Sequence, residues 1–181
     1  MALYRTYRIT KEGERIDGVC LLAFINSERY YLGHIGIYRN GMIDCRKLVN
    51  FEEFKEIVRS GWVATQLSPG ATAGVFPLVS FTIRNVPYGI DSEEFIKEVS
   101  DEIEGLNGRP MTDERCRMIW TIYQASHTDA AKEGLRIAFE AITKHNRDHV
   151  LRNMGETDCP IRAVLYPDVE LCRRALHSYI S

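Results

Sequence analysis

The sequence predicts an α+β protein in which a mainly antiparallel sheet in the N-terminal half is packed by helices of the C-terminal half. Strand-like segments come first along the chain and helical patterns follow, which is the order typical of this class. Asn40-Gly41 separates two apolar segments and marks a tight β-hairpin. With 181 residues, of which 45% are hydrophobic, the chain can bury one core. We therefore expect a single domain over residues 1–181, with a β-rich half over 1–90 and a helical half over 91–181.

Alternating or continuous apolar segments predict the strands of the β-rich half. Residues 17–25 form a nearly continuous apolar run, which is typical of a central strand covered on both faces. The turn at Asn40-Gly41 pairs residues 30–38 with residues 42–49. Residues 68–74 are rich in small side chains and predict a loop. Further strands are expected over residues 3–9, 62–67 and 76–86.

Capping patterns predict where the helices begin. Asn50 followed by Glu53 forms a capping box at the start of a short helix, and Gly61 ends that helix. In the helical half, the short apolar run over residues 161–166 predicts one late strand that completes the sheet. Helices are expected there over residues 92–106, over 111–125, from Ser126 to about Met154, and from Pro167 onward.

Charge and cysteine usage exclude several classes of partner. The formal net charge of −2 argues against nucleic acid, because domains that bind it carry a basic excess. No apolar run approaches the ~20 residues that cross a bilayer, so we expect no membrane association. The first residues lack the layout of a signal peptide. Five scattered cysteines without a C-x-x-C motif suit a reducing compartment, which predicts a cytoplasmic protein.

Cys45 and His34 are the candidate catalytic pair. With a two-residue loop, Gly36 faces Cys45 and His34 lies diagonal to it on the same face, with Cβ atoms about 7–8 Å apart. A cysteine nucleophile requires such a nearby base. Asp44 points to the other face and cannot orient the histidine. We therefore favour a buried cysteine and a histidine at the sheet rim, with no catalytic residue, and keep Cys45 with His34 as the alternative.

His145 and His149 form the candidate metal site. In an α-helix their i, i+4 spacing places two imidazoles on one face, and Cys159 could supply a third ligand from the following loop. The glutamate base of an H-E-x-x-H site is missing, and the segment is polar all round. We therefore favour a solvated basic face and expect neither a metal nor another cofactor.

Aromatic residues around the hairpin are the candidate binding residues. Tyr30, Tyr38 and Trp62 cluster on the hairpin and on a strand expected beside it, and Asp44 lies near one end of the returning strand. Tyrosine and tryptophan are favoured at recognition surfaces because they bury much area with few rotatable bonds. The alternative for these aromatic side chains is packing inside the core.

A short pattern carries one resemblance. Tyr38-x-x-Gly41-x-Ile43-Asp44-Cys45 is followed by Phe54 and by Gly61-Trp62-Val63. This arrangement within residues 30–70 resembles one seen in small uncharacterised bacterial proteins. The resemblance implies a shared core of a β-hairpin and a helix, and it carries over no activity and no catalytic residue.

These observations favour a non-catalytic, cytosolic binding protein that recognises a protein or peptide partner through its β-rich half. A toxin-neutralising protein of the immunity type is one form of this hypothesis. The alternative is a small cysteine-dependent or metal-assisted hydrolase, so whether the chain is an enzyme stays open. A third reading is a structural role in which the helical half forms a homodimer.

Overall fold

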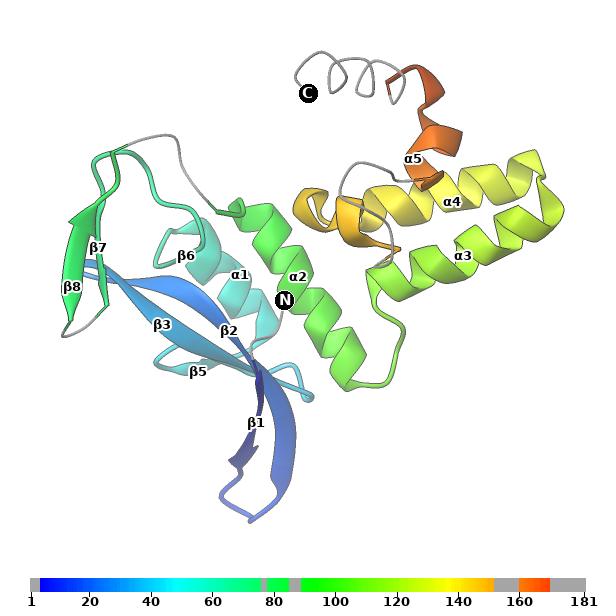
Figure 1. Ribbon diagram of the computed structural model, residues 1–181. Coiled ribbons are helices and arrows are strands. Elements are labelled where there is room, and N and C mark those ends of the chain that lie inside the picture. The colour runs from blue at the N-terminus through cyan, green and yellow to red at the C-terminus, as the bar shows by residue number, and fades with distance from the viewer. Residues whose placement is uncertain (1–3, 76–77, 85–88, 152–159, 170–181) are drawn as a thin grey trace. The chain divides into compact units, whose positions relative to one another are not determined.

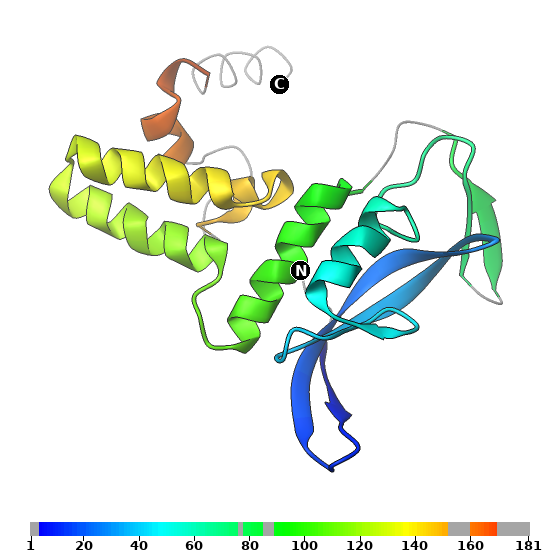
Figure 2. The same cartoon turned by 180° about the vertical axis from the view of Figure 1, so that it is seen from behind.

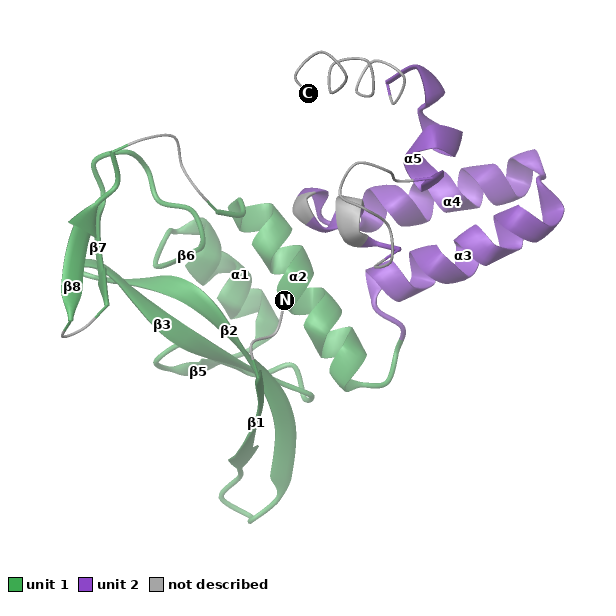
Figure 3. Ribbon diagram, in the orientation of Figure 1, with its two compact units in different colours: residues 1–109 green, residues 110–181 purple. Residues whose placement is uncertain are grey.

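The chain folds into two compact units, residues 1–109 and residues 110–181 (Figure 3). The computed structural model describes residues 4–75, 78–84, 89–151 and 160–169. An antiparallel sheet with packed helices confirms the α+β class. The predicted boundary between the β-rich and helical halves is at residue 90, whereas the two units divide at residue 109. The reason is that helix α2 (Ser92–Leu106) packs against the sheet and so belongs to the first unit.

The first unit is an eight-stranded sheet with two helices (Figure 1). The strand order is β1-β2-β3-β4-β5, with β6 beside β2 and β7 beside β3. All pairs are antiparallel except β3 with β7, and β8 pairs with β7. The elements are β1 (Tyr4–Ile9), β2 (Arg15–Ser27), β3 (Arg29–Tyr38), β4 (Ile43–Asp44), β5 (Leu48–Val49), α1 (Phe51–Arg59), β6 (Val63–Ala64), β7 (Thr72–Val75), β8 (Val79–Thr82) and α2.

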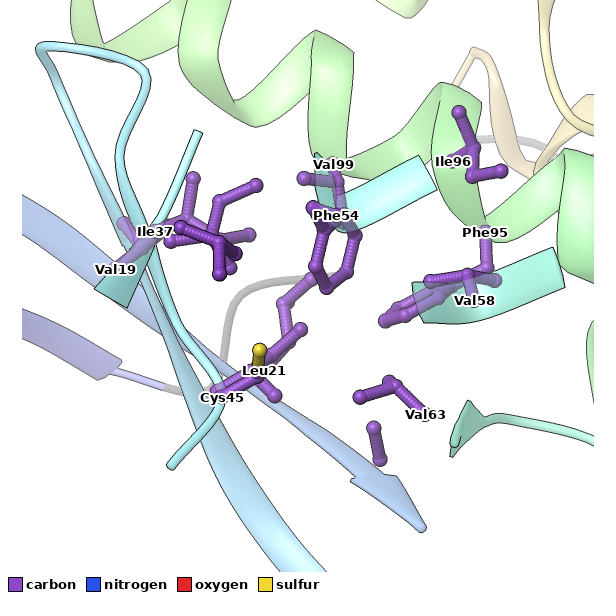
Figure 4. Close-up of a cluster of buried hydrophobic side chains, with 14 residues drawn as sticks. Val19, Leu21, Ile37, Cys45, Phe54, Val58, Val63, Phe95, Ile96 and Val99 are labelled. Atoms are coloured by element: carbon purple, nitrogen blue, oxygen red, sulfur yellow. The ribbon is translucent and has the colours of Figure 1, made fainter. Parts of the chain in front are cut away.

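Helices α1 and α2 lie on one face of this sheet (Figures 1 and 2). The capping box predicted for α1 is present, since the Asn50 side chain accepts from the Glu53 amide at 2.9 Å. Asp91 caps α2 in a similar way. The apolar stripes of both helices meet the sheet in one core (Figure 4). Its buried members are Val19, Leu21, Ala23, Ile35, Ile37, Ile43, Cys45, Val49, Phe54, Val58, Val63, Phe95, Ile96 and Val99.

Within the described residues of this unit, no helix covers the other sheet face, which we call the open face. Residues that oppose each other across antiparallel strands share a face. The register therefore places one row of side chains across five strands, from β1 to β5: Tyr4, Cys20, Gly36, Asp44 and Leu48. By the alternation along each strand, the open face also carries Leu22, Leu32, His34 and Tyr38.

The β3–β4 hairpin differs from its predicted form by one residue. Tyr38 pairs with Met42, and its amide donates to the Met42 carbonyl at 3.0 Å, so the loop has three residues instead of two. Gly41 takes the left-handed conformation (φ +78°), as a type I turn followed by a bulge requires. Gly36 consequently faces Asp44 rather than Cys45. A shift of one residue moves every side chain of the returning strand to the opposite face.

Other predictions for the first unit also need correction. The strand predicted over residues 62–67 is shorter than expected, since only the two residues of β6 are extended there. The loop predicted over residues 68–74 contains most of β7. The strand predicted over 76–86 is β8 within the described residues. The run 17–25 lies in β2, as predicted for a strand. It is not covered on both faces, since Leu22 projects from the open face and is exposed.

The second unit is helical, and its late strand was wrongly predicted. Residues 161–166 lie mostly in α5, because Pro160 suits a first helical turn and Ile161 packs against an α-helical core. The predicted helix to Met154 ends at Ala141. There Arg147 donates to the carbonyls of Glu140 and Ile142 at 2.8 and 2.9 Å, which satisfies the end of the helix. The elements are α3 (Thr112–Ser126), α4 (Asp129–Ala141), the 3₁₀ helix η1 (Lys144–His149) and α5 (Pro160–Leu165).

Two glycines allow the Tyr38 ring to lie flat on the sheet. Gly18 opposes Tyr38, and Gly36 lies two residues before it on the same face. A Cβ atom at Gly36 would come within 2.9 Å of the Tyr38 hydroxyl. A Cβ atom at Gly18 would press on the Ile37 carbonyl and come within 2.7 Å of the Tyr38 ring. Tyr38 is therefore buried although it lies on the open face.

We predict that Gly18→Ala lowers the free energy of unfolding by about 1–3 kcal/mol, because the new methyl group meets backbone that cannot move aside. Gly33→Ala is the matched control, since its Cβ atom would meet only the end of the Ile25 side chain, at 3.2 Å. We expect the control to stay within about 1 kcal/mol of wild type. Urea unfolding followed by circular dichroism measures both, and equal losses would contradict the close-approach argument.

Candidate functional site

Cys45 and His34 do not form a pair. Cys45 lies on the helix-covered face within the main core, where its sulfur is surrounded by apolar side chains (Figure 4). His34 is exposed on the open face, opposite Leu22. Burial raises the pKa of the Cys45 thiol, and the nearest polar contact is a long one, from the sulfur to the Lys47 carbonyl at 3.8 Å. A thiol held neutral and without a base is a poor nucleophile.

The cysteine that shares a face with His34 is Cys20. It opposes Gly36 and Tyr4, and so takes the position that the sequence analysis assigned to Cys45. A hydrogen bond with the Cys20 side chain raises the pKa of the Tyr4 hydroxyl. The Tyr4 and His34 rings meet edge to face, with centroids 5.7 Å apart. These three side chains form a small polar group in an otherwise apolar part of the open face.

The predicted metal ligands are only partly within the described structure. Cys159 lies outside the described residues. His145 and His149 belong to η1, which is a 3₁₀ helix. The placement of these two side chains lies outside what the structure describes, so the two-histidine site stays a prediction. Among the residues that the structure describes, no group of three or more His, Cys, Asp or Glu side chains could hold a metal ion.

The four predicted binding residues have different environments. Trp62 packs against the main core and so supports the packing alternative. Tyr30 donates its hydroxyl to the Gly61 carbonyl at 3.2 Å and joins a small cluster at one end of the sheet. Tyr38 is buried on the open face, and the Arg8 guanidinium lies 5.6 Å from its ring centroid. Asp44 is exposed on the open face, whereas Tyr30 and Trp62 are half-buried.

Large apolar side chains are exposed on the open face. Tyr4 is 50% exposed, Leu22 40%, and Leu32 36%. These three come from β1, β2 and β3, which are neighbours in the sheet, and Leu48 of β5 adds another exposed side chain at the far side. Single exposed apolar residues are common, but a group on one sheet face is typical of an interaction surface. This group is the candidate functional site.

Strand β8 continues the open face beyond β3. Phe81 opposes Ala73 of β7, which itself lies beside Tyr30 of β3. Val79 has the same orientation as Phe81, because side chains two residues apart share a face. Val79 is 56% exposed and Phe81 41%. Val79 and Phe81 therefore project from the same side of the sheet as the open face, while Ala73, between them and β3, is buried against Leu67.

Sequence reasoning missed most of this surface. It assigned Leu22 and Cys20 to a strand covered on both faces, because the run of apolar residues in β2 hides the alternation. A signal was present on the partner strand, where Gly33, His34 and Gly36 interrupt the apolar pattern. Small and polar residues at this density are unusual for a strand buried on both faces.

No helix in the described part of the chain combines the length and the hydropathy required to cross a membrane.

The raised pKa of Cys45 predicts a pH effect on stability. The folded chain keeps this thiol protonated at a pH where the unfolded chain releases the proton. Its contribution is thus fully present below the ordinary cysteine pKa of about 8.5 and is lost as the pH rises above it, by at most about 1.4 kcal/mol per pH unit. The stability difference between wild type and Cys45→Ala should shrink between pH 8 and about 10. Urea unfolding across this range measures it, and a constant difference would contradict the buried thiol.

Two family models match the chain. The domain of unknown function DUF7638 matches residues 5–110, and the domain of unknown function DUF7639 matches residues 111–175. The two matches meet where the compact units meet. No curated protein and no solved structure matches the chain. Because the first match covers more than half of the 181 residues, the chain belongs to the DUF7638 family.

Proposed function

We propose that this protein binds a protein or peptide partner through the open face of its sheet. The observation that carries the proposal is the grouping of exposed Tyr4, Leu22 and Leu32 side chains on neighbouring strands of that face. Covering such side chains releases about 25 cal/mol for each Å² of apolar surface removed from water. A partner that covers this face therefore gains free energy without a catalytic step.

The polar side chains of the open face suit partner recognition better than they suit catalysis. His34 and Asp44 are exposed among the apolar side chains and can fix the orientation of a partner by hydrogen bonds. Cys45, the thiol of the alternative hydrolase hypothesis, is on the opposite face with a raised pKa. A large apolar patch with few polar groups is typical of an interface core.

A charge introduced into the patch tests the proposal. Leu22→Lys with Leu32→Lys should weaken partner binding by about 100-fold, because each lysine removes an apolar contact and places a charge in the interface. Both positions are exposed, so the melting temperature should stay close to wild type. A photo-crosslinking side chain at position 32 identifies the partner, and calorimetry with the purified partner gives the dissociation constants.

Met118→Lys is the matched control, because Met118 is also an exposed apolar side chain but belongs to α3 in the second unit. We expect this control to bind like wild type. If the control loses binding and the double variant keeps it, the partner site lies in the second unit and the proposal is wrong.

A further inference from the structure

Strand β8 is an edge strand without the protection that the other edges have. Within the described residues, each of β1, β5, β6 and β8 pairs with one neighbour only. Strand β1 carries Arg5 and Arg8, and β5 and β6 have two residues each. Charged side chains and short length are two ways in which proteins keep edges from pairing with other chains. Strand β8 has four residues, Val79–Thr82, all of them exposed and uncharged.

The backbone of β8 presents hydrogen-bonding groups outward at two positions. The Ile83 amide donates to the Ala71 carbonyl at 2.9 Å, and the Ile83 carbonyl accepts from the Gly70 amide at 2.7 Å, so both groups of residue 83 point toward β7. Backbone groups alternate in direction along an antiparallel strand. Those of Ser80 and Thr82 therefore point away from β7. The edge offers an N–H and a C=O group at each of these residues.

The side chains beside this edge belong to the open face. Val79 and Phe81 project from it, as their pairing with β7 shows. A strand added outside β8 would place every second side chain on the same face, next to Val79 and Phe81. A partner segment on this edge thus makes main-chain hydrogen bonds and apolar contacts at the same time, which is the mode of recognition by strand addition.

We propose that the β8 edge binds an extended segment of a partner protein, with uncharged apolar side chains at alternate positions. This inference rests on the proposed function, since the added segment would lead the partner onto the open face. A second copy of the chain fits the edge less well. Pairing of two four-residue strands covers far less than the roughly 1,200 Å² of a stable interface.

Ser80→Pro tests the proposal in the full chain. Proline removes the outward N–H group of residue 80, and a sheet edge tolerates it because the bonds to β7 are kept. The probe is a fluorescein-labelled peptide, Lys-Thr-Val-Thr-Val-Thr-Lys with blocked ends, and fluorescence anisotropy measures its binding. We expect saturable binding to wild type with a Kd below about 1 mM and a loss of at least about tenfold in Ser80→Pro. Ser80→Ala keeps the N–H group and should bind like wild type.

Hydrogen exchange of the wild-type chain gives a readout that does not depend on the folding of any variant. With peptide bound, the Ser80 and Thr82 amides should gain protection, while the Phe81 amide, which already bonds to β7, should change little. A peptide methylated at alternate amide nitrogens should give neither binding nor protection, because it cannot donate to the edge.

Three results would overturn the proposal: no binding to wild type at 1 mM peptide, equal binding to wild type and Ser80→Pro, or a wild-type dimer that Ser80→Pro dissociates. The last result would assign the edge to a second copy. The proposed function is tested separately by the lysine variants at positions 22 and 32. If these abolish partner binding and Ser80→Pro does not, the open face remains the binding surface and strand addition is wrong.

Discussion

The antiparallel pairing of β2 with β3 is the constraint on which the rest of the first unit depends. The two strands oppose each other over ten residue pairs, from Gly18 with Tyr38 to Ser27 with Arg29. Because side chains alternate along both strands, this register sends Ile35 and Ile37 to the helices and His34 and Gly36 to the other side. The neighbouring strands and the two helices pack on this strand pair, whose Ile35 and Ile37 side chains lie on the helix side.

The three-residue loop at the end of this pair decides the chemistry of the first unit. With it, Cys45 turns toward Phe54 and the helices, and the thiol becomes part of a core that raises its pKa. With a loop one residue shorter, the same thiol would share a face with His34. The length of the loop thus decides whether Cys45 lies beside His34 or in the core. With three residues in the loop, Cys45 has a packing role.

In the described part of the first unit, helices cover only one side of the sheet, which explains why the other side carries exposed apolar residues. The core needs one covered face, and the capped helices α1 and α2 supply it. Three large side chains stay accessible on the open face, namely Phe81 of β8, Leu32 of β3 and Tyr4 of β1. They define the surface that the proposed partner would cover. The unprotected edge at β8 adds a direction from which an extended chain can approach that face.

The sequence by itself determined the local structure: the α+β class, the capping box of α1, and the long strands around the Asn40-Gly41 turn. These features depend on contacts between residues close in the chain, which a pattern of residue types records. Only the tertiary structure decided that residues 161–165 are helical, that Cys45 is buried and that Leu22 is exposed. Each of these depends on which distant segment covers a residue. Helix α5 shares its core with Cys116 and Phe139, and no pattern within its six residues specifies those partners.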